Sequence, residues 1–156
     1  MAALGITPLP QIRFLHDIGD AMVAAVGPQR RDSLYRHASF LHAGLRVPGS
    51  SDRPVADGAP LAAIESMVTR LTSTGELVGP DERVDVLTAL RAYTLDTAWI
   101  AGEEHLRGSL TPGKLADFVV LGDDVTTIDP SRISATEVVA TFLGGECMHG
   151  ADGLDG

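Results

Sequence analysis

The stretch that decides the fold lies in the last third of the chain and reads RGSLTPGKLADFVVL, residues 107–121. Pro112 and Gly113 predict a type II turn, because proline presets φ at the second turn position and glycine supplies the positive φ needed at the third. The apolar, β-branched run at residues 116–121 follows and predicts a strand. The helical spacing seen earlier in the chain therefore gives way here to short strands.

A second β-branched run, VVATFL at residues 138–143, leads through Gly144 and Gly145 into the segment ECMH. Two glycines between two such runs are typical of a two-residue hairpin loop, whose turn requires positive φ at both positions. We therefore expect an all-β part at residues 107–150. The last residues, ADGLDG at 151–156, are expected to form a flexible, solvated tail.

The part of the chain before residue 107 shows helical patterning. Leu61, Ile64, Val68 and Leu71 recur at the spacing of one apolar helix face. Gly75 is a suitable residue to end this element, because glycine adopts the left-handed conformation that closes many helices. A helix over the sixties is therefore expected.

Two further helices are predicted from their start and stop residues. Asp85 is a suitable N-cap for a helix over residues 86–100, since its carboxylate can accept a hydrogen bond from the first turn. Residues 29–43 predict another helix, with Pro28 suited to the first turn and Gly44 just past the end.

Short extended segments separate these helices. Residues 45–47 predict a strand that ends at Pro48, because proline cannot donate a ladder hydrogen bond inside a sheet. Residues 6–11 contain two prolines and favour a strand end or an extended segment. Strands alternating with helices, followed by strands alone, predict an α/β fold with an all-β end.

One carboxylate follows the predicted strand in the segment VPGSSDRPV, residues 47–55. A residue at the C-terminal end of a strand in an α/β sheet or barrel faces the region where ligands bind. Gly49 would let the backbone approach a ligand closely. Asp52 is therefore a candidate functional carboxylate, although Asp beside Ser and Pro is also common as a turn residue or a helix cap.

Composition restricts the class of protein. The 156 residues suffice for one domain of ordinary size, and the apolar fraction of 44% with a mean hydropathy of +0.13 is that of a globular chain. The chain carries 21 acidic and 12 basic residues, a formal charge of −9. This charge repels phosphate backbones and anionic lipids, so we expect neither nucleic acid nor a membrane as partner.

Cysteine usage and the N-terminus bear on localisation. Cys147 is the only cysteine, so no internal disulfide can form and nothing favours an oxidising compartment. The N-terminal residues lack a basic region followed by an apolar one, and no uncharged run approaches the ~18 residues of a membrane span. We predict a cytoplasmic protein.

The histidines do not form a metal-binding motif. No two of the five have the His-x-His or H-E-x-x-H spacing that directs two imidazoles to one ion, so each is interpreted as a surface or packing residue. The chain also contains no nucleophile elbow, Walker loop or dinucleotide fingerprint. From its residues alone, it lacks a complete catalytic set.

Four segments read in order resemble the C-terminal third of a metal-dependent amidohydrolase: GSSDRPV, DVLTALRAYTLDTAWIAGEE, RGSLTPGKLADFVVL and VVATFLGGE. The resemblance is to amidohydrolase family 3, the group similar to N-substituted formamide deformylase. It implies a (β/α)8 barrel of the TIM type joined to a small β-sandwich. Residues 1–106 would be the last strands and helices of the barrel, and residues 107–150 part of the sandwich.

The resemblance also implies roles for two residues. Asp52 matches the aspartate after the eighth barrel strand, which would ligate or sit beside a divalent metal, zinc in many relatives, and accept a proton from the attacking water. Arg53 stands where relatives often have a bulky pocket residue, which implies contact with a polar or anionic group of the substrate. The alternative for Arg53 is a surface arginine paired with Asp57 or Asp85.

The sequence departs from the family pattern in its metal ligands. Nothing matches the His-x-His, the bridging residue or the two later histidines of the family, and Met1 falls near the approach to the seventh strand. A catalytic zinc needs about three protein ligands, so Asp52 alone would not hold one. Two barrel strands also leave open edges and exposed apolar faces.

These features predict a truncated hydrolase of carbon–nitrogen bonds in small amide-type substrates, inactive and without bound metal on its own. The alternative is a non-catalytic remnant or interaction module. Such a module would pair through exposed barrel edges with a second copy or with a complementing N-terminal chain.

Overall fold

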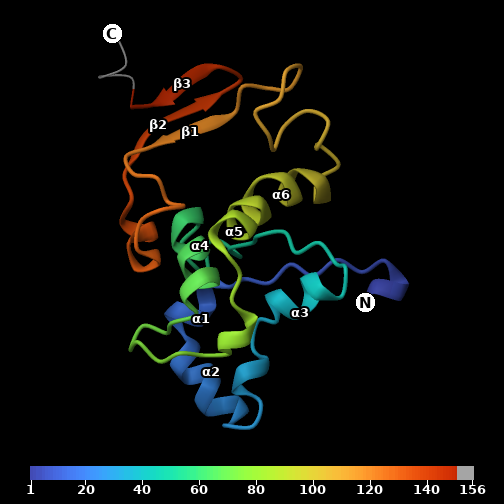
Figure 1. The fold of residues 1–156 in the computed structure, drawn as a ribbon, viewed down its shortest axis with the longest axis vertical. Coiled ribbons are helices and arrows are strands. Elements are labelled where there is room, and N and C mark those ends of the chain that lie inside the picture. Colours follow the sequence, from blue (N-terminus) through green and yellow to red (C-terminus); the bar gives the residue numbers. More distant parts are fainter. Residues whose placement is uncertain (151–156) are drawn as a thin grey trace.

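The computed structural model describes residues 1–150, which form an elongated molecule with helices in the body and a small sheet at one end (Figure 1). The expected tail, residues 151–156, lies outside the described residues. The α-helices are α1 (Arg13–Asp17), α2 (Gly19–Val26), α3 (His37–His42), α4 (Pro60–Thr69), α5 (Val86–Tyr93) and α6 (Leu95–Ile100). Short 3₁₀ helices are η1 (Ala2–Leu4), η2 (Arg31–Ser33), η3 (Pro80–Glu82) and η4 (Pro130–Ala135). The strands are β1 (Phe118–Leu121), β2 (Val138–Leu143) and β3 (Glu146–His149).

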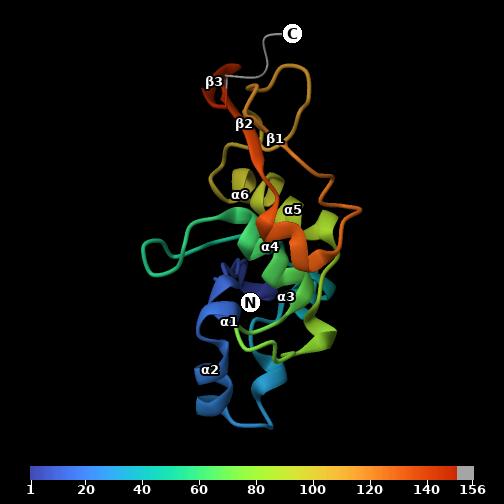
Figure 2. The same cartoon turned by 90° about the vertical axis from the view of Figure 1, so that its left-hand side faces the viewer.

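Helix α4 lies at the centre of the body, with α1, α5 and η4 packed around it (Figure 2). Its residues Ile64 and Met67 are each 2% exposed and join a core that includes Ile12, Leu15 and, from η4, Ile133. The Ser134 N–H also donates to Glu65 Oε2 at 2.8 Å. Segments far apart in the sequence thus share one hydrophobic core.

The predicted apolar face of α4 is confirmed, but the end of the helix is not where glycine was expected. The helix stops at Thr69, and Arg70 takes the left-handed conformation with φ 60 as its C-cap. Leu71 lies beyond the helix in an isolated β-bridge with Leu77, and Gly75 is part of the turn between them. The buried side chain of Arg70, described below, accounts for this early stop.

The helix predicted over residues 86–100 begins as expected and then breaks. The Asp85 carboxylate accepts a hydrogen bond from the Thr88 N–H at 2.8 Å, which confirms the N-cap. At Thr94 the backbone leaves the helical region (φ −125, ψ −87), and the chain continues as α6. The hydroxyl of Thr97 donates to the Ala92 carbonyl at 2.7 Å and satisfies it at the break.

The helix predicted over residues 29–43 is wrong for its first half. Only η2 and α3 form, and Tyr35 between them has φ 50, which no right-handed helix accommodates. The carbonyl groups of Leu34 and Tyr35 point to the Arg70 guanidinium rather than along a helix axis. A tertiary contact has therefore overridden the local helical spacing.

The strand predicted at residues 45–47 does not form, and residues 6–11 are likewise without strand structure. Val47 and Pro48 are buried, but the backbone here meets no neighbouring strand within residues 1–150. A strand exists only through its ladder partners. The expected barrel is thus not confirmed in this part of the molecule; the segments that would be its strands are extended chain.

The predicted strands of the C-terminal part are confirmed as one antiparallel sheet in the order β1-β2-β3. Gly144 and Gly145, with φ 59 and 85, form the expected two-residue hairpin loop. The Lys114 N–H donates to the Thr111 carbonyl at 3.1 Å, and Gly113 has φ 93, as the predicted type II turn requires. One layer is described, so the second sheet of a sandwich is absent from residues 1–150.

No helix formed by residues 1–150 is long and apolar enough to cross a membrane.

Candidate functional site

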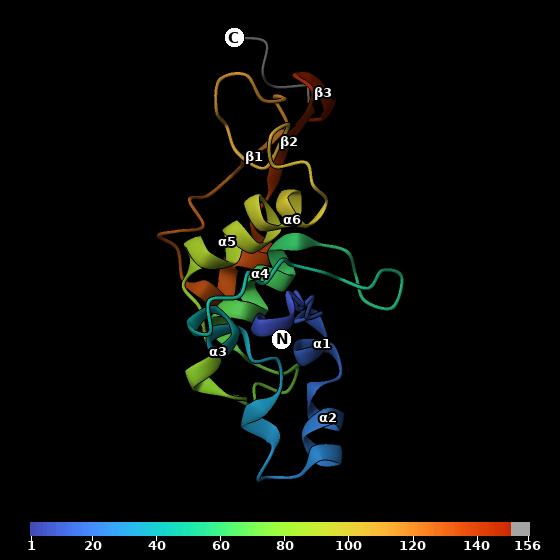
Figure 3. The ribbon, with the colours of Figure 1, turned by 90° about the vertical axis from the view of Figure 1, so that its right-hand side faces the viewer.

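Asp52 lies in a loop, residues 48–59, that projects from the helical body between α3 and α4 (Figure 3). Its side chain is exposed, and its backbone is in the left-handed region with φ 55. The loop carries Asp52 away from the core rather than into a closed cavity. The candidate carboxylate is therefore accessible, and within residues 1–150 it belongs to no group of three or more His, Cys, Asp or Glu side chains that could hold a metal ion.

The base of this loop is held tightly by the end of α5. The Gly49 N–H donates to the Ala92 carbonyl at 2.9 Å, and the Tyr93 hydroxyl donates to the Ser50 carbonyl at 3.2 Å. A Cβ added at Gly49 would lie 2.5 Å from the Tyr93 ring, so only glycine fits there. Burial raises the pKa of Tyr93 to about 12, which keeps its hydroxyl a hydrogen-bond donor at neutral pH.

The sequence predicts that Gly49 lets the backbone approach a ligand closely, but the structure gives this glycine a different neighbour.

 The close approach at Gly49 is made by the Tyr93 ring of the chain itself and not by a ligand. The glycine that the sequence associated with binding therefore fixes where the Asp52 loop leaves the body.

Arg53 is exposed beside Asp52, and its aliphatic stem lies over Gly58, where an added Cβ would be 3.0 Å from Arg53 Cδ. The ion pairs formed within residues 1–150 do not include Arg53, so the pairing with Asp57 or Asp85 considered above does not form. The Asp85 carboxylate is occupied by Thr88. The guanidinium of Arg53 is left facing solvent.

The residues that the structure describes do not fit a catalytic metal ion. Within residues 1–150, no group of three or more His, Cys, Asp or Glu side chains could hold one. The histidines are dispersed: His16 contacts Asp17, His37 is buried, and His42, His105 and His149 are exposed at separate places. Asp52 is the one residue that resembles a metal ligand of the family pattern, and residues 1–150 do not complete a set of three ligands around it.

Sequence reasoning missed a buried polar group at the centre of the body. Arg70 is 0% exposed and donates to three backbone carbonyl groups: Nε to Val78 at 2.9 Å, Nη1 to Tyr35 at 2.8 Å and Nη2 to Leu34 at 2.6 Å. Burial lowers the pKa of Arg70 to about 10, so the guanidinium remains charged at neutral pH. An arginine directly after an apolar helix face was the signal available in the sequence.

Glu82, on η3, is a second buried charge that the sequence did not single out. It accepts hydrogen bonds from the N–H of Ser39 at 2.8 Å and from the Ser39 hydroxyl, so it caps the first turn of α3 from a distant segment. Burial acts to raise the pKa of Glu82, but the bonds from Ser39 outweigh it and leave the pKa below its usual value. Both buried charges thus order the backbone that leads to the Asp52 loop.

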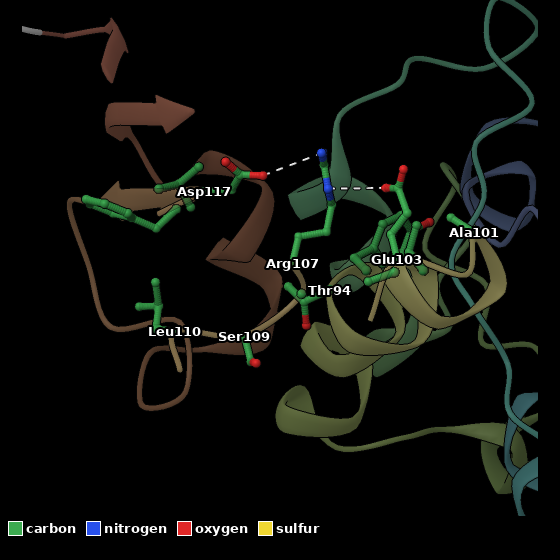
Figure 4. A pocket seen from close by; sticks show the side chains of 13 residues that line it. Thr94, Ala101, Glu103, Arg107, Ser109, Leu110 and Asp117 are labelled. Carbon is green, nitrogen blue, oxygen red and sulfur yellow. Dashed lines mark ion pairs between the residues drawn. The ribbon is translucent and has the colours of Figure 1, made fainter. Parts of the chain in front are cut away.

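A cavity with a volume of about 540 Å³ lies between α5, α6 and β1 (Figure 4). Arg107 is placed at its wall between two carboxylates, with Nε 3.2 Å from Glu103 Oε2 and Nη1 3.5 Å from Asp117 Oδ2. Asp117 also accepts a hydrogen bond from the Gly144 N–H at 2.7 Å. These charges pair with one another, so they tie the sheet to the helices instead of offering a reactive group.

Comparison with known proteins places these segments in a family. The model of a family described as "Amidohydrolase family" matches residues 1–149. Protein LONG AFTER FAR-RED 3 of Arabidopsis thaliana is 35% identical over 86% of this chain and 23% of its own length. N-substituted formamide deformylase of Arthrobacter pascens is 32% identical over 75% of this chain and 22% of its own length. The putative amidohydrolase YtcJ of Bacillus subtilis (strain 168) is 29% identical over 82% of this chain and 25% of its own length.

A solved structure gives the same result for the fold. An amidohydrolase from Thermotoga maritima MSB8 superposes with a TM-score of 0.55 at 20% identity, covering 72% of this chain and 25% of that chain. The chain thus spans about a quarter of the length of the relatives it matches.

Proposed function

Because the chain belongs to the amidohydrolase family, we propose that it is the C-terminal part of a metal-dependent hydrolase of carbon–nitrogen bonds in small amide-type compounds. The observation that carries this proposal is the match over residues 1–149 to a family whose members here are about four times longer. Residues 1–106 correspond in the proposal to the end of the barrel, and residues 107–150 to part of a β-sandwich.

Asp52 is this chain's proposed contribution to the active site, as metal ligand and proton acceptor. Its support is its position on an accessible loop whose base is fixed by Gly49 and Tyr93. Arg53, with its guanidinium facing solvent next to Asp52, is proposed to bind a polar or anionic group of the substrate. The divalent metal, zinc in this proposal, requires ligands from the remainder of the fold.

The chain alone is proposed to be inactive, and this is tested on the purified 156-residue protein. Metal content and hydrolysis of a simple N-substituted formamide are measured together. We expect less than stoichiometric zinc and no turnover, because the described residues assemble no set of three ligands. Stoichiometric zinc with turnover would contradict the inactivity.

The role of Asp52 is tested in a chimera. The C-terminal segment of the Arthrobacter pascens deformylase that aligns with this chain is replaced by this chain. If hydrolysis of the formamide is retained, Asp52→Asn is expected to lower kcat by ~100-fold or more, the usual size of a general-base contribution. Asp57→Asn, an exposed carboxylate in the same loop, is the matched control and should leave kcat unchanged. Equal effects of the two substitutions on kcat would show that Asp52 is not part of the active site.

The alternative function, an interaction module, is favoured by the exposed apolar residues of the sheet. Val119, Leu143 and Met148 are 53%, 54% and 61% exposed, and the outer edges of β1 and β3 have no neighbouring strand within residues 1–150. Open edges and exposed apolar side chains are features of sheets that pair with another chain. Size-exclusion chromatography with light scattering, together with an unfolding curve, distinguishes the hydrolase fragment from the interaction module. A monomer that unfolds cooperatively counts against self-association.

A further inference from the structure

The side chain of His37 has an unsatisfied nitrogen inside the helical body. The residue is 1% exposed, and its Nδ1 lies 3.3 Å from the Tyr35 carbonyl oxygen. Because a carbonyl oxygen only accepts, Nδ1 carries the proton and Nε2 presents a lone pair. Nε2 is buried and has no hydrogen-bond partner within residues 1–150. A buried acceptor without a donor is costly, so it indicates a missing partner.

His37 lines a cavity of about 250 Å³ between α3, α4 and α5. Leu41, Val47, Met67 and Ala92 contribute apolar walls. With Nδ1 turned to its own backbone, the Nε2 edge is the polar part of the ring left for the cavity. The volume corresponds to several water molecules, at ~30 Å³ each, and approaches the lower end of small-molecule sites.

The other polar residues of the cavity wall already have partners. The Thr88 hydroxyl donates to Asp85 at 2.8 Å, and Arg91 Nε lies 3.3 Å from Asp96 Oδ1. An anion would be repelled by Asp96 and a metal ion by Arg91, and one imidazole cannot hold a metal. Burial lowers the pKa of His37 to about 4, so the ring is neutral at physiological pH.

We propose that this cavity is a binding site for a small, uncharged aromatic alcohol whose hydroxyl donates to His37 Nε2 and whose ring packs against Leu41, Val47 and Met67. The hydroxyl supplies the donor that Nε2 lacks. An aromatic ring suits the apolar walls, and the thioether of Met67 adds favourable sulfur–aromatic contact. This site is separate from the Asp52 loop and does not depend on the hydrolase proposal.

Phenol is the probe, and toluene, which has the same shape without the donor, is the matched control. Each is titrated into the 156-residue protein while the His37 ring nitrogens are followed by long-range ¹H–¹⁵N NMR. We expect the free protein to show the Nδ1–H tautomer and phenol to shift Nε2. Phenol should bind at least about tenfold more tightly than toluene, the value of one hydrogen bond. Equal binding of phenol and toluene, an unshifted Nε2, or occupancy by water alone would overturn the proposal.

Two variants test the contributions of the hydrogen bond and of the cavity to binding separately. His37→Phe keeps an aromatic ring and removes the acceptor, so the preference for phenol over toluene should disappear. Ala92→Leu fills the cavity from α5 and should abolish the Nε2 shift by phenol. A preference for phenol that survives His37→Phe would overturn the proposal. The wild-type comparison of phenol with toluene stands even if either variant fails to fold.

Discussion

The Asp52 loop and the segments around Arg70 are built in opposite ways. Arg70 is fully buried, and its guanidinium donates to three carbonyl groups of two separate segments. Asp52 and Arg53 are exposed, and their loop is tied to the body only at its base. The residues expected to act on substrate contribute little to the fold, whereas the residues that hold the fold together have no place in the expected chemistry.

The largest effect should come from removing the buried guanidinium. Arg70→Met keeps the apolar stem but leaves the Val78 and Leu34 carbonyl groups without donors, at ~1–3 kcal/mol each. We expect the free energy of unfolding to fall by at least ~2 kcal/mol, measured by urea denaturation followed by circular dichroism. Arg83→Met, which removes an exposed guanidinium from the Thr69 carbonyl, is the control and should cost under ~1 kcal/mol. Similar losses of stability in Arg70→Met and Arg83→Met would contradict the view that the buried guanidinium holds the fold together.

The second effect is a loss of stability in mild acid through His37. Its pKa is about 4 when folded, below the ordinary 6.5, so its contribution is fully present above pH 6.5 and is lost as the pH falls toward 4. This difference in the pKa of His37 corresponds to ~3 kcal/mol in the free energy of unfolding. Arg70, the C-cap of α4, and Glu82 of η3 act on the ring, and Arg91 and Asp96 lie across the cavity.

Urea denaturation at a series of pH values measures this loss. His37→Phe should flatten the stability curve between pH 6.5 and 4.5, whereas the exposed His42→Gln should not change its shape. Glu82, whose pKa is lowered, stays ionised through this window and contributes only below it. A wild-type curve that is flat here would show that His37 can become charged in the folded state.

A smaller effect tests the base of the Asp52 loop. Gly49→Ala places a Cβ against the Tyr93 ring and should cost ~1–3 kcal/mol, as overpacking does. Gly122→Ala, where the added Cβ meets ordinary contacts at 3.4 Å, is the control. Combining Gly49→Ala with Tyr93→Leu should recover part of the loss. Strict additivity of the two substitutions would show that the ring and the glycine are not coupled.

The smallest effect is expected at the loop itself. Asp52→Asn should change the free energy of unfolding by less than ~0.5 kcal/mol, because the side chain is exposed on a projecting loop. The same urea titration measures it. A loss above ~1 kcal/mol would mean that Asp52 is a structural residue of the turn, the alternative that its neighbours Ser and Pro also allow.

Local signals predicted well where the structure is local. The Pro112-Gly113 turn, the Gly144-Gly145 hairpin and the Asp85 cap depend on a few adjacent residues, and all three form. The apolar face of α4 was also predicted, because it packs on a core that this chain supplies. Elements of this kind can be inferred from one sequence.

The failures share a different cause. The helix over residues 29–43 lost its first half to Arg70, a residue almost forty positions later, and spacing within the segment could not reveal that contact. The strand at residues 45–47 needed ladder partners that residues 1–150 do not provide. For the site, the motif located Asp52, but only coordinates could show that residues 1–150 assemble no set of three metal ligands around it.

The contacts that join the sheet to the helices differ in character. On one side η4 packs Ile133 into the apolar core beside α4; on the other, Arg107 spans Glu103 and Asp117 at separations of 3.2 and 3.5 Å. At about 1 M salt the screening length shrinks to ~3 Å, similar to those separations, while apolar packing is not weakened. Concentrated salt should therefore weaken the attachment through Arg107 more than the apolar attachment through η4.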